Sequence, residues 1–453
     1  MSRPGGTSAL RALYIGLSYL AAPAAFFLLL WRGFSNHGYW QRLGERLGYG
    51  AARASQDTIW IHAVSVGEVQ AAVPLVEALV QRFPGIPIAI TTMSPTGSAR
   101  AAALFGDRVL HSYAPYDLPG AVARFFDRLR PRIAIIMETE LWPNLYHECG
   151  RRGIPLVLAS ARISPRSMGR YRVLVGLFRE TLSHGIVIAA QSARDADRFI
   201  QLGAPPERTH VIGTLKFDQP LRHDQAGWGH DFRRRHWASR AVWIAASTHP
   251  GEEQTVIGIQ QRLQRRGENR VLLLAPRHPE RCDVVEQLLR DSGLRYCRHS
   301  VARAGDIAGC EVFLIDTLGE LNAFYGSADI AFVGGSLVPI GGHNLLEPAA
   351  HGLPVLTGPY NFNSEDVLDL LVAAGAAEVV ADERELQARV ESLLADPAER
   401  QRRGALGRDA VAANRGAVRR LLEFLQPLIE ASDAEGSAPA RSGLGSSVSP
   451  RSG

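Results

Sequence analysis

The sequence predicts an α/β protein with two doubly wound domains, and three observations support this prediction. Short apolar segments alternate with helical patterns, as expected for parallel sheets that are covered by helices on both faces. The alternation forms two series of similar length, separated by a polar stretch at 218–240. The 453 residues are also too many for one ordinary hydrophobic core and suit two domains of about 150 to 200 residues each.

The first series predicts one parallel sheet with its helices. Segment 68–82 carries Val69, Val73, Val76 and Val80 at a spacing of three to four, which is typical of an amphipathic helix. The strands are expected at 57–64, 86–92, 108–113, 132–138, 154–160, 185–190 and 209–213. Because these segments are short and alternate with helices, we expect them to pair in parallel.

The second series predicts a second sheet of the same kind. Its strands are expected at 241–247, 270–276, 312–316, 329–333 and 354–357. The segment 218–240 is polar and lacks strand periodicity, so we expect a linker there. The helical stretch 397–430 is expected to pack back across the domains, and the tail 431–453 has a disordered composition. The predicted domains are therefore 35–217 and 241–430.

The N-terminus contains an uncharged, mostly apolar run at 13–30, about long enough to cross a bilayer core. Arginine and aromatic residues that suit a membrane–water interface flank it, namely Arg3, Arg11, Trp31, Arg32, Tyr39, Trp40, Arg42 and Arg46. A cleaved signal peptide and a buried helix are the alternatives, but the run continues past the Ala-Pro-Ala sequence at 22–24. We therefore expect a membrane anchor within residues 1–34.

The positive charge of the chain is almost all arginine, and Lys216 is the single lysine. Forked arginine donors suit carboxylates and phosphates, so the net charge of +5 favours acidic substrates over nucleic acid. The four cysteines have no C-x-x-C spacing and are expected to be reduced thiols rather than a zinc site. P-loop, dinucleotide, H-E-x-x-H and D-x-D motifs are missing at the expected places, so we predict neither a metal nor another cofactor.

Acidic side chains follow two strands of the first series. Glu68 comes directly after Gly67, where an apolar strand turns into a helix. It could be a first-turn glutamate stabilised by the helix dipole, or a general base that takes a proton from a hydroxyl. The two roles are compatible if the helix N-terminus keeps the carboxylate ionised. Glu138 and Glu140 end another strand, where one carboxylate could instead cap the next helix.

A basic segment follows the next strand of the first series. Arg162, Arg166, Arg170 and Arg172 place four positive charges within eleven residues, without an acidic residue among them. A solvated face and a binding site for an anionic substrate are both consistent with this pattern.

Four strand-to-helix loops of the second series carry polar residues. Ser247, Thr248 and His249 could offer hydroxyls and backbone donors to a phosphate, and Arg277 could contact a phosphate or a base. The third loop is 316–321. The fourth, 332–356, has paired glycines, with Asn344 and Glu347 near a helix start. Each loop alone is a weak signal, but all four lie at carboxyl ends of strands, where ligands of such sheets bind.

Taken together, these motifs resemble the Kdo (3-deoxy-D-manno-octulosonic acid) transferase family of lipopolysaccharide synthesis. The resemblance rests on W-Q-R-L-G-E-R-L-G from Trp40, H-A-V-S-V-G-E-V, M-E-T-E-L-W-P-N, S-A-R-I-S, G-T-L-K-F-D, A-P-R-H-P-E-R, L-G-E-L and G-G-H-N-L-L-E-P-A. These stretches occur in family order from the N-terminus to about residue 360. Lys216 lies inside G-T-L-K-F-D, which indicates that arginine could not replace it there.

The resemblance implies a GT-B fold, in which two Rossmann-like domains face an interdomain cleft. The first domain would bind the acceptor and the second the nucleotide sugar. It further implies inverting transfer of Kdo from CMP-Kdo to a lipid A precursor, lipid IVA, by an enzyme held at the cytoplasmic side of the inner membrane by a single N-terminal anchor. The resemblance implies that the enzyme uses CMP-Kdo as its donor substrate, that it needs no cofactor and that it does not bind nucleic acid.

The resemblance also assigns site residues. Glu68 would be the general base and Glu140 the second acidic residue, with Glu138 as the less favoured choice. The CMP site would consist of Pro276, Arg277, Gly319, Glu320, Leu321, Asn344, Leu345, Leu346 and Glu347. Further phosphate or sugar contacts are expected from Ser247, Thr248, His249, Arg162 and Lys216.

Two other functions stay open at this point. A nucleotide-sugar epimerase or hydrolase with a GT-B fold would need no membrane anchor. A non-catalytic membrane scaffold would show no thermal stabilisation by CMP.

Overall fold

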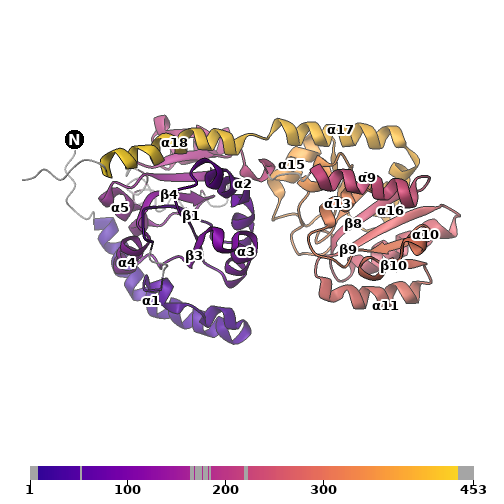
Figure 1. Ribbon diagram of the computed structural model, residues 1–453, viewed down its shortest axis with the longest axis horizontal. Coiled ribbons are helices and arrows are strands. Elements are labelled where there is room, and N and C mark those ends of the chain that lie inside the picture. The colour runs from indigo at the N-terminus through magenta and orange to yellow at the C-terminus, as the bar shows by residue number, and fades with distance from the viewer. Residues whose placement is uncertain are drawn as a thin grey trace, which may run out of the picture. The chain divides into compact units, whose positions relative to one another are not determined.

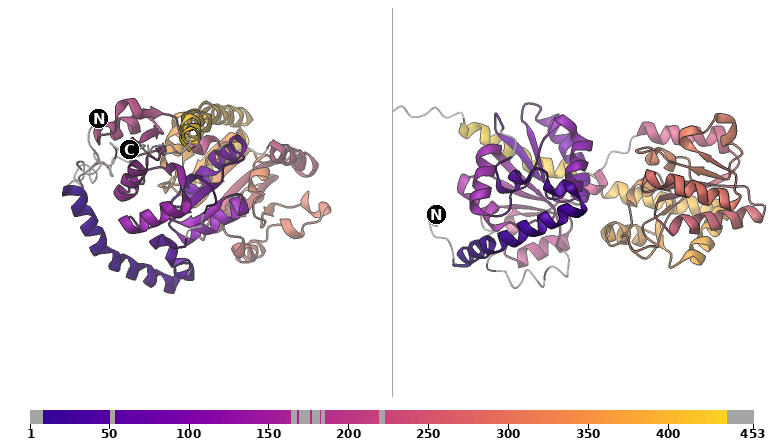
Figure 2. Two further views of the ribbon diagram at one scale, coloured as in Figure 1. Left: turned by 60° about the vertical axis from the view of Figure 1, so that its left-hand side comes forward. Right: turned by 90° about the horizontal axis from the view of Figure 1, so that it is seen from below.

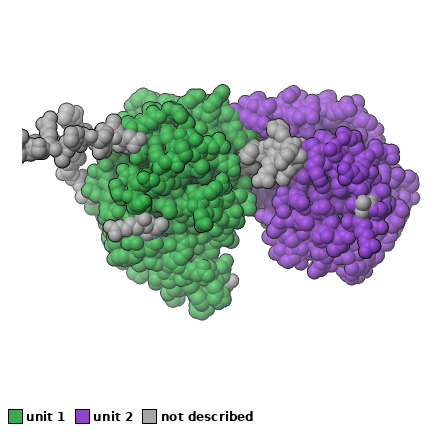
Figure 3. Space-filling view, in the orientation of Figure 1, with its two compact units in different colours: residues 1–219, 416–453 green, residues 220–415 purple. Residues whose placement is uncertain are grey.

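The chain forms two compact units (Figure 3). The computed structural model describes residues 9–50, 54–163, 168, 176, 182, 185–218 and 223–436. Residues 1–219 and 416–453 make up unit 1, and residues 220–415 make up unit 2.

Unit 1 contains a seven-stranded sheet of order β3-β2-β1-β4-β5-β6-β7, in which all pairs are parallel. The strands are β1 (Thr58–His62), β2 (Ile88–Thr92), β3 (Leu110–Tyr113), β4 (Pro131–Met137), β5 (Leu156–Ala161), β6 (Val187–Ala190) and β7 (Thr209–Val211). The order reverses between β1 and β4, which pair with Ile61 opposite Ile135. Ligands of doubly wound sheets bind beyond the carboxyl ends of strands at such a switch point.

Helices cover both faces of this sheet (Figure 1). They are α2 (Val66–Arg82), α3 (Pro95–Phe105), α4 (Pro119–Leu129), α5 (Pro143–Arg152), α8 (Ala193–Gln201) and α18 (Ala417–Gly436), and the short 3-10 turn η5 spans Leu215–Asp218. One core lies between the sheet and α2, α3 and α18, and the other lies beneath α4, α5 and α8.

Unit 2 repeats this architecture with a seven-stranded parallel sheet of order β10-β11-β9-β8-β12-β13-β14. Its strands are β8 (Ala241–Thr248), β9 (Arg270–Pro276), β10 (Tyr296–Arg298), β11 (Val312–Leu314), β12 (Ile330–Val333), β13 (Val355–Thr357) and β14 (Ala377–Val379). Its helices are α9 (His223–Trp237), α10 (Glu252–Arg265), α11 (Cys282–Ser292), α12 (Ala304–Ile307), α13 (Leu321–Tyr325), α14 (Leu346–Ala350), α15 (Glu365–Ala373), α16 (Glu383–Ala395) and α17 (Pro397–Ala413). The switch point lies between β8 and β12.

Two segments differ from the boundaries that the sequence predicts. The expected linker 218–240 contains α9, whose Phe232 and Trp237 are buried in a core of unit 2. The low apolar content of this segment misled the prediction, because two aromatic side chains suffice to dock the helix. The end of the predicted domain 241–430 forms α18, whose Leu421, Leu425 and Ile429 complete a core of unit 1. The predicted tail begins inside α18, and its residues from 437 lie outside the described residues.

The N-terminal helix α1 (Ala9–Ser35) belongs to unit 1 and runs beside it in Figure 2. Its segment Ala9–Phe34 has a mean hydropathy of 1.9 and could cross a membrane by length and composition. Large apolar side chains such as Leu20 (78% exposed) and Phe34 (75%) point away from the protein. Near its two ends, the hydroxyl of Tyr14 donates to Asp117 (2.9 Å) and the backbone carbonyl of Leu30 accepts from Trp40 (2.9 Å).

Candidate functional site

Glu68 lies in the first turn of α2, directly beyond β1 at the switch point of unit 1. Ser65 caps this helix by accepting from the backbone N–H of Glu68 (3.4 Å). The carboxylate of Glu68 folds back and accepts from the Val64 N–H (2.8 Å) and from the Ser65 hydroxyl (3.0 Å). These hydrogen bonds, which resemble a capping box, give the acidic residue a role in capping α2 at this position.

Burial decides the charge of Glu68. The residue is only 8% exposed, and this burial raises its pKa to about 8. The hydrogen bonds from Val64 and Ser65 act against this rise, whereas the charges of Glu138 and Glu140 add to it. The expectation that the helix N-terminus keeps Glu68 ionised is therefore wrong, because loss of hydration outweighs the helix dipole.

Glu138 and Glu140 follow β4, the neighbour of β1, and the three carboxyl groups act on one another electrostatically. The carboxylate of Glu138 lies 3.8 Å from the ammonium of Lys216. Glu140 accepts from the indole N–H of Trp142 (2.9 Å), and the hydroxyl of Tyr146 donates to its backbone carbonyl. Burial raises the pKa of Glu140, with a further contribution from Glu138 and an opposing one from Trp142.

Neither glutamate caps the helix that follows. Asp117 does so, by accepting from the backbone N–H groups of Asn144 (3.0 Å) and Leu145 (2.8 Å) at the start of α5. Glu138 and Glu140 are therefore not the caps of α5, and their carboxylates remain candidates for the functional site.

His62 is a residue of this region that the sequence reasoning missed. It is the last residue of β1 and is fully buried, and its Nδ1 lies 2.8 Å from the hydroxyl of Thr91. Its Nε2 is buried without a hydrogen-bond partner. The ring packs edge-on against Trp142, with centroids 6.3 Å apart, and burial lowers its pKa to about 4. The sequence feature that could have pointed to His62 is its position as the first residue of the H-A-V-S-V-G-E motif, which also contains Glu68.

The predicted basic segment is described only in part. Arg162 is half-buried and follows β5. Arg166, Arg170 and Arg172 lie outside the described residues.

In unit 2, Glu252 organises the loops at the switch point. It is 1% exposed and accepts from the backbone N–H groups of His249 (3.0 Å), Gly335 (2.7 Å), Ser336 (3.0 Å) and Leu337 (2.9 Å). A Cβ atom on Gly334 would lie 2.7 Å from its carboxylate. The paired glycines therefore allow a close approach to a buried carboxylate of the protein itself, which binds the backbone N–H groups of Gly335, Ser336 and Leu337.

Two histidines meet above this network. The Nε2 atoms of His249 and His343 lie 2.8 Å apart, with stacked rings, and the ring of His278 lies 5.7 Å from that of His249. Burial lowers the pKa of His343 to about 4, and His249, Arg277 and His278 contribute to this shift. Burial also lowers the pKa of His249. Both rings are thus neutral near pH 7, and one N–H of the pair faces an acceptor nitrogen.

The predicted phosphate contacts lie beside this pair. Ser247 adopts a left-handed conformation (φ 56°), and the hydroxyl of Thr248 is buried without a partner. Pro276 ends β9 opposite Thr248, whose carbonyl accepts from the backbone N–H of Arg277 (3.0 Å). The side chain of Arg277 is exposed. The structure thereby brings together Thr248, His249 and Arg277 from adjacent strand ends.

The remaining predicted nucleotide contacts lie in two further loops. Gly319 is exposed with φ 85°, Glu320 contacts Thr317 and His299, and Leu321 begins α13. These residues form one exposed turn, which leaves its backbone accessible to a ligand.

The loop before α14 is more enclosed. Asn344 donates to Glu347 (3.0 Å) and accepts from the Leu346 N–H (2.9 Å). Burial raises the pKa of Glu347, whereas its hydrogen bond with Asn344 lowers it. The side chains of Leu345 and Leu346 are buried at 0% and 8% exposure. These two leucines can therefore offer a ligand their backbone groups but not their side chains.

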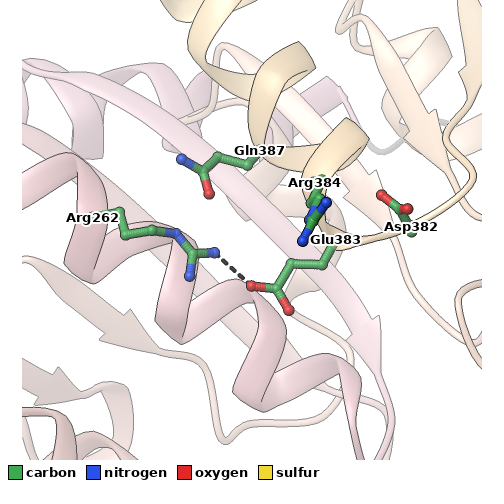
Figure 4. Close-up of a pocket in the computed structure, with 5 residues that line it drawn as sticks. All are labelled: Arg262, Asp382, Glu383, Arg384 and Gln387. Carbon is green, nitrogen blue, oxygen red and sulfur yellow. Dashed lines mark hydrogen bonds and ion pairs between the residues drawn. The ribbon is translucent and has the colours of Figure 1, made fainter.

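Unit 2 also has a surface depression (Figure 4). It is lined by Arg262, Asp382, Glu383, Arg384 and Gln387, and Arg262 is paired with Glu383 at 2.6 Å. None of the predicted site residues lines it. Within the described ranges, no group of three or more His, Cys, Asp or Glu side chains is arranged to hold a metal ion.

Comparison with known proteins identifies the family. The family model described as 3-Deoxy-D-manno-octulosonic-acid transferase (kdotransferase) matches residues 41–219. The chain is 41% identical to the 3-deoxy-D-manno-octulosonic acid transferase of Haemophilus influenzae over 93% of this chain and 99% of that protein. The chain belongs to the 3-deoxy-D-manno-octulosonic acid (Kdo) transferase family. The Kdo transferase of Bordetella pertussis is 38% identical over 94% of this chain and 99% of the relative.

A solved structure supports the fold. A UDP-GlcNAc 2-epimerase from Neisseria meningitidis matches 82% of this chain and 100% of its own, with a TM-score of 0.54 and 13% identity. At this identity the likeness shows the fold alone. It confirms the predicted class of two Rossmann-like domains of GT-B type. The residues 41–219 that match the Kdo transferase family model include Glu68, Glu138, Glu140 and Lys216.

Proposed function

We propose that this protein transfers Kdo from CMP-Kdo to a lipid A precursor in lipopolysaccharide synthesis, with lipid IVA as the acceptor and Glu68 as the general base. Membership of the Kdo transferase family supports the reaction class. The observation that carries the residue assignment is a buried carboxyl group at the switch point of unit 1, with a pKa of about 8. A general base is most effective when its pKa lies near the working pH.

The proposed chemistry is a single displacement. The hydroxyl of the acceptor gives its proton to the ionised carboxylate of Glu68, and its oxygen attacks the anomeric carbon of Kdo. The bond from that carbon to the phosphate oxygen breaks, CMP leaves, and the anomeric configuration is inverted. With a pKa of about 8, about one tenth of Glu68 is ionised at pH 7, so catalysis should accelerate as the pH rises.

Unit 2 would bind the CMP part of the donor. The exposed guanidinium of Arg277 and the unpartnered hydroxyl of Thr248 offer donors for a phosphate beside the neutral His249–His343 pair. Charge develops on the phosphate as CMP leaves, and such donors stabilise it. The exposed turn at Gly319 and Glu320 and the enclosed loop at Asn344 and Glu347 would contact the nucleoside.

Unit 1 would bind the acceptor. Lys216 and Arg162 are the positive side chains that the site motifs place beyond the strand ends of this unit, and both are partly exposed. We assign them to the anionic groups of the lipid A precursor or to the Kdo carboxylate. The reaction proposed in this way needs CMP-Kdo as its donor and no cofactor.

The helix α1 would hold the enzyme on the inner membrane, with both units on the cytoplasmic side. Its partly or fully buried residues are Arg11, Tyr14, Ile15, Ser18, Ala22, Phe26, Leu29 and Gly33, but only 6% of its apolar segment is buried. Leu13, Leu20, Phe27 and Trp31 lie on the exposed side, at 60%, 78%, 66% and 64% exposure. Because the apolar surface of the helix is mostly exposed and its length suits the hydrocarbon core, we propose that α1 inserts into the bilayer.

The central test is incubation of the full-length protein with CMP-Kdo and lipid IVA, followed by mass spectrometry of the lipid. The proposal predicts a lipid product heavier by Kdo, together with released CMP. Free Kdo and CMP without a modified lipid would instead indicate a hydrolase. An absence of any CMP release, with no thermal stabilisation by CMP, would indicate a scaffold.

The membrane proposal has its own test. We expect the double variant Leu20→Lys/Phe27→Lys to lose flotation with phospholipid vesicles, because both side chains belong to the exposed apolar side of α1. Val301→Lys, at an exposed apolar position of unit 2, serves as the control. Undiminished flotation of the double variant would contradict the lipid-facing assignment.

A further inference from the structure

The end of strand β10 binds the exposed turn at 316–320 of unit 2. β10 lies at the edge of the sheet and pairs with β11, with Arg298 opposite Leu314 (Figure 1). Arg298, which ends β10, and the two residues after it, His299 and Ser300, all contact carboxylates of this turn. One short segment therefore holds a turn that is expected to contact the nucleotide.

The first end of the turn is held at Asp316. The side chain of Asp316 is only 4% exposed. It accepts from Nε of Arg298 (2.5 Å) and from both the backbone N–H (3.0 Å) and the hydroxyl (2.5 Å) of Ser300. Arg298 also donates to Asp283 (2.6 Å) and Glu286 (3.0 Å) of α11. Because three donors, one of them a charged arginine, share this carboxylate, the place of Asp316 is fixed.

The second end of the turn is held by His299. Its Nε2 lies 3.1 Å from Oε2 of Glu320, and the hydroxyl of Thr317 donates to the same oxygen. Because an ionised carboxylate only accepts, Nε2 of His299 carries a proton in this contact. The imidazole packs edge-on against Phe324, with centroids 5.1 Å apart, and against Phe313 (5.5 Å), and both phenylalanines are fully buried. The packing fixes the orientation of the ring and hence the place of Glu320.

The middle of the turn is open to a ligand. Leu318 is 77% exposed, and a Cβ atom on Gly319 (φ 85°) would meet no atom within 4 Å. Both contacts of the Glu320 carboxylate are made by Oε2, and no described residue binds Oε1. The side chain of Glu320 is 50% exposed. The turn therefore presents a free carboxylate oxygen that can accept from an N–H or O–H group of a nucleoside.

We propose that His299 is a positioning residue for nucleotide binding, because it holds Glu320 so that the free oxygen of this carboxylate accepts a hydrogen bond from the nucleoside of CMP-Kdo. Arg298 and Ser300 hold the other end of the turn through Asp316. The inference rests on the proposed donor site of unit 2 and adds a function for a segment that does not touch the ligand itself. Since His299 acts through Glu320, the effects of the two residues on CMP binding should not be additive.

The test is a double-mutant cycle on CMP affinity, measured by calorimetric titration of the full-length protein. His299→Leu removes the donor, and we expect CMP to bind roughly 3-fold to 10-fold more weakly, the effect of about one hydrogen bond. Glu320→Ala should weaken binding at least as much. Adding His299→Leu to Glu320→Ala should cause no further loss, because the group through which His299 acts is gone. Gln287→Leu, at an exposed position of α11, is the control and should bind CMP like the wild type.

Two further measurements distinguish a positioning role from a structural one. His299→Gln keeps an N–H donor and should restore most of the CMP affinity that His299→Leu loses. In transfer assays, His299→Leu should raise the KM for CMP-Kdo and leave both kcat and the KM for lipid IVA unchanged. A failure of His299→Gln to restore affinity would mean that only the packing of the ring matters, and this result would overturn the proposal.

Other outcomes would also overturn it. These are an unchanged CMP affinity in His299→Leu, an equal loss when His299→Leu is added to the wild type and to Glu320→Ala, and a lower kcat with an unchanged KM for CMP-Kdo. An absence of CMP binding by the wild type would instead refute the proposed donor site, so the two failures can be told apart.

Discussion

The switch points of the two units occupy equivalent places in two similar sheets but gather opposite kinds of ionisable groups. Unit 1 brings together Glu68, Glu138 and Glu140, whereas unit 2 brings together His249, His278 and His343. Burial raises the pKa of Glu68 to about 8 and lowers that of His343 to about 4. The same loss of hydration therefore leaves both groups largely neutral at pH 7.

The difference lies in how each unit satisfies its polar groups. The buried carboxylate of unit 2, Glu252, accepts four backbone N–H groups and locks the loops of the switch point together. Glu68 of unit 1 accepts from one backbone N–H and one hydroxyl. The switch point of unit 2 is thus held rigid by Glu252, whereas the switch point of unit 1 keeps a carboxyl group that can exchange a proton. This comparison supports the proposal that unit 2 binds CMP and that unit 1 accepts the proton.

The largest expected effect separates these two roles. Glu68→Gln should lower transfer by about 100-fold to 10,000-fold, since it removes the proton acceptor. CMP binding, measured by calorimetry, should stay unchanged. Glu77→Gln on the same helix is the control and should leave transfer intact. If Glu68→Gln also lost CMP binding, this result would contradict the proposed separation of proton transfer in unit 1 from CMP binding in unit 2.

The converse variant lies in unit 2. Arg277→Ala should weaken CMP binding by about 10-fold to 100-fold, which corresponds to the loss of one charge-assisted hydrogen bond. Arg265→Ala replaces an exposed arginine near the end of α10 and should bind CMP normally. Calorimetric titration with CMP compares the two. Equal affinities of the two variants for CMP would show that Arg277 does not contribute to CMP binding.

The rigid frame of unit 2 can be tested at Gly335. Its φ is 68°, and an added Cβ atom would lie 2.8 Å from Nε2 of His343. We expect Gly335→Ala to lower the free energy of unfolding by about 2 kcal/mol, from backbone strain and the clash together. Gly293→Ala, with φ 70° and open space around its Cβ, isolates the strain and should cost about 1 kcal/mol. Chemical denaturation measures both, and equal losses would show that the His343 contact is dispensable.

The smallest expected effect concerns stability against pH. The folded-state pKa of Glu68, about 8, is above the ordinary value of 4.5, so its contribution is complete below pH 4.5 and is lost as the pH rises through 8. The pKa of His343, about 4, is below 6.5, so its contribution is present above pH 6.5 and is lost as the pH falls through 4. Glu68→Gln should therefore reduce the alkaline loss of stability, and His343→Gln the acid loss.

Each of these changes should be on the order of 1 kcal/mol, because relaxation and water penetration around a buried charge reduce its cost. Thermal denaturation of both variants from pH 4 to pH 10 measures them. Identical pH profiles for the two variants would contradict the opposite pKa shifts of the two units.

The sequence predicted the sheets well, because strand segments with continuous apolar character, such as β4, are buried on both faces whatever packs on them. It placed α9 in a linker and α18 in the second domain, although the expectation that 397–430 packs back across the domains is confirmed. The attachment of α9 depends on Phe232 and Trp237 and that of α18 on a stripe of apolar residues, and local pattern does not say which core receives a helix. The short strands β10 and β14 were missed because each lies at an edge of the sheet and contains a charged residue, so that neither forms a continuous apolar run.

The placement of the candidate residues at strand ends was predictable from the sequence, whereas their electrostatics were not. Motif order placed Glu68 and Glu140 at strand ends, but the pKa of Glu68 depends on burial by residues distant in sequence. The paired glycines at 334 and 335 were noticed in the sequence, but the sequence did not show that the carboxylate of Glu252 lies against Gly334. No local pattern could show this, because Glu252 comes from another strand-to-helix loop of the same sheet.

The pH dependence of kcat/KM for transfer to lipid IVA tests the central claim most directly. A buried Glu68 acting as the base predicts a rise in kcat/KM with pH and a midpoint near 8, as its pKa requires. A midpoint near 4.5, the ordinary value for glutamate, would contradict the account, since it would mean that the proton acceptor is a solvated carboxylate.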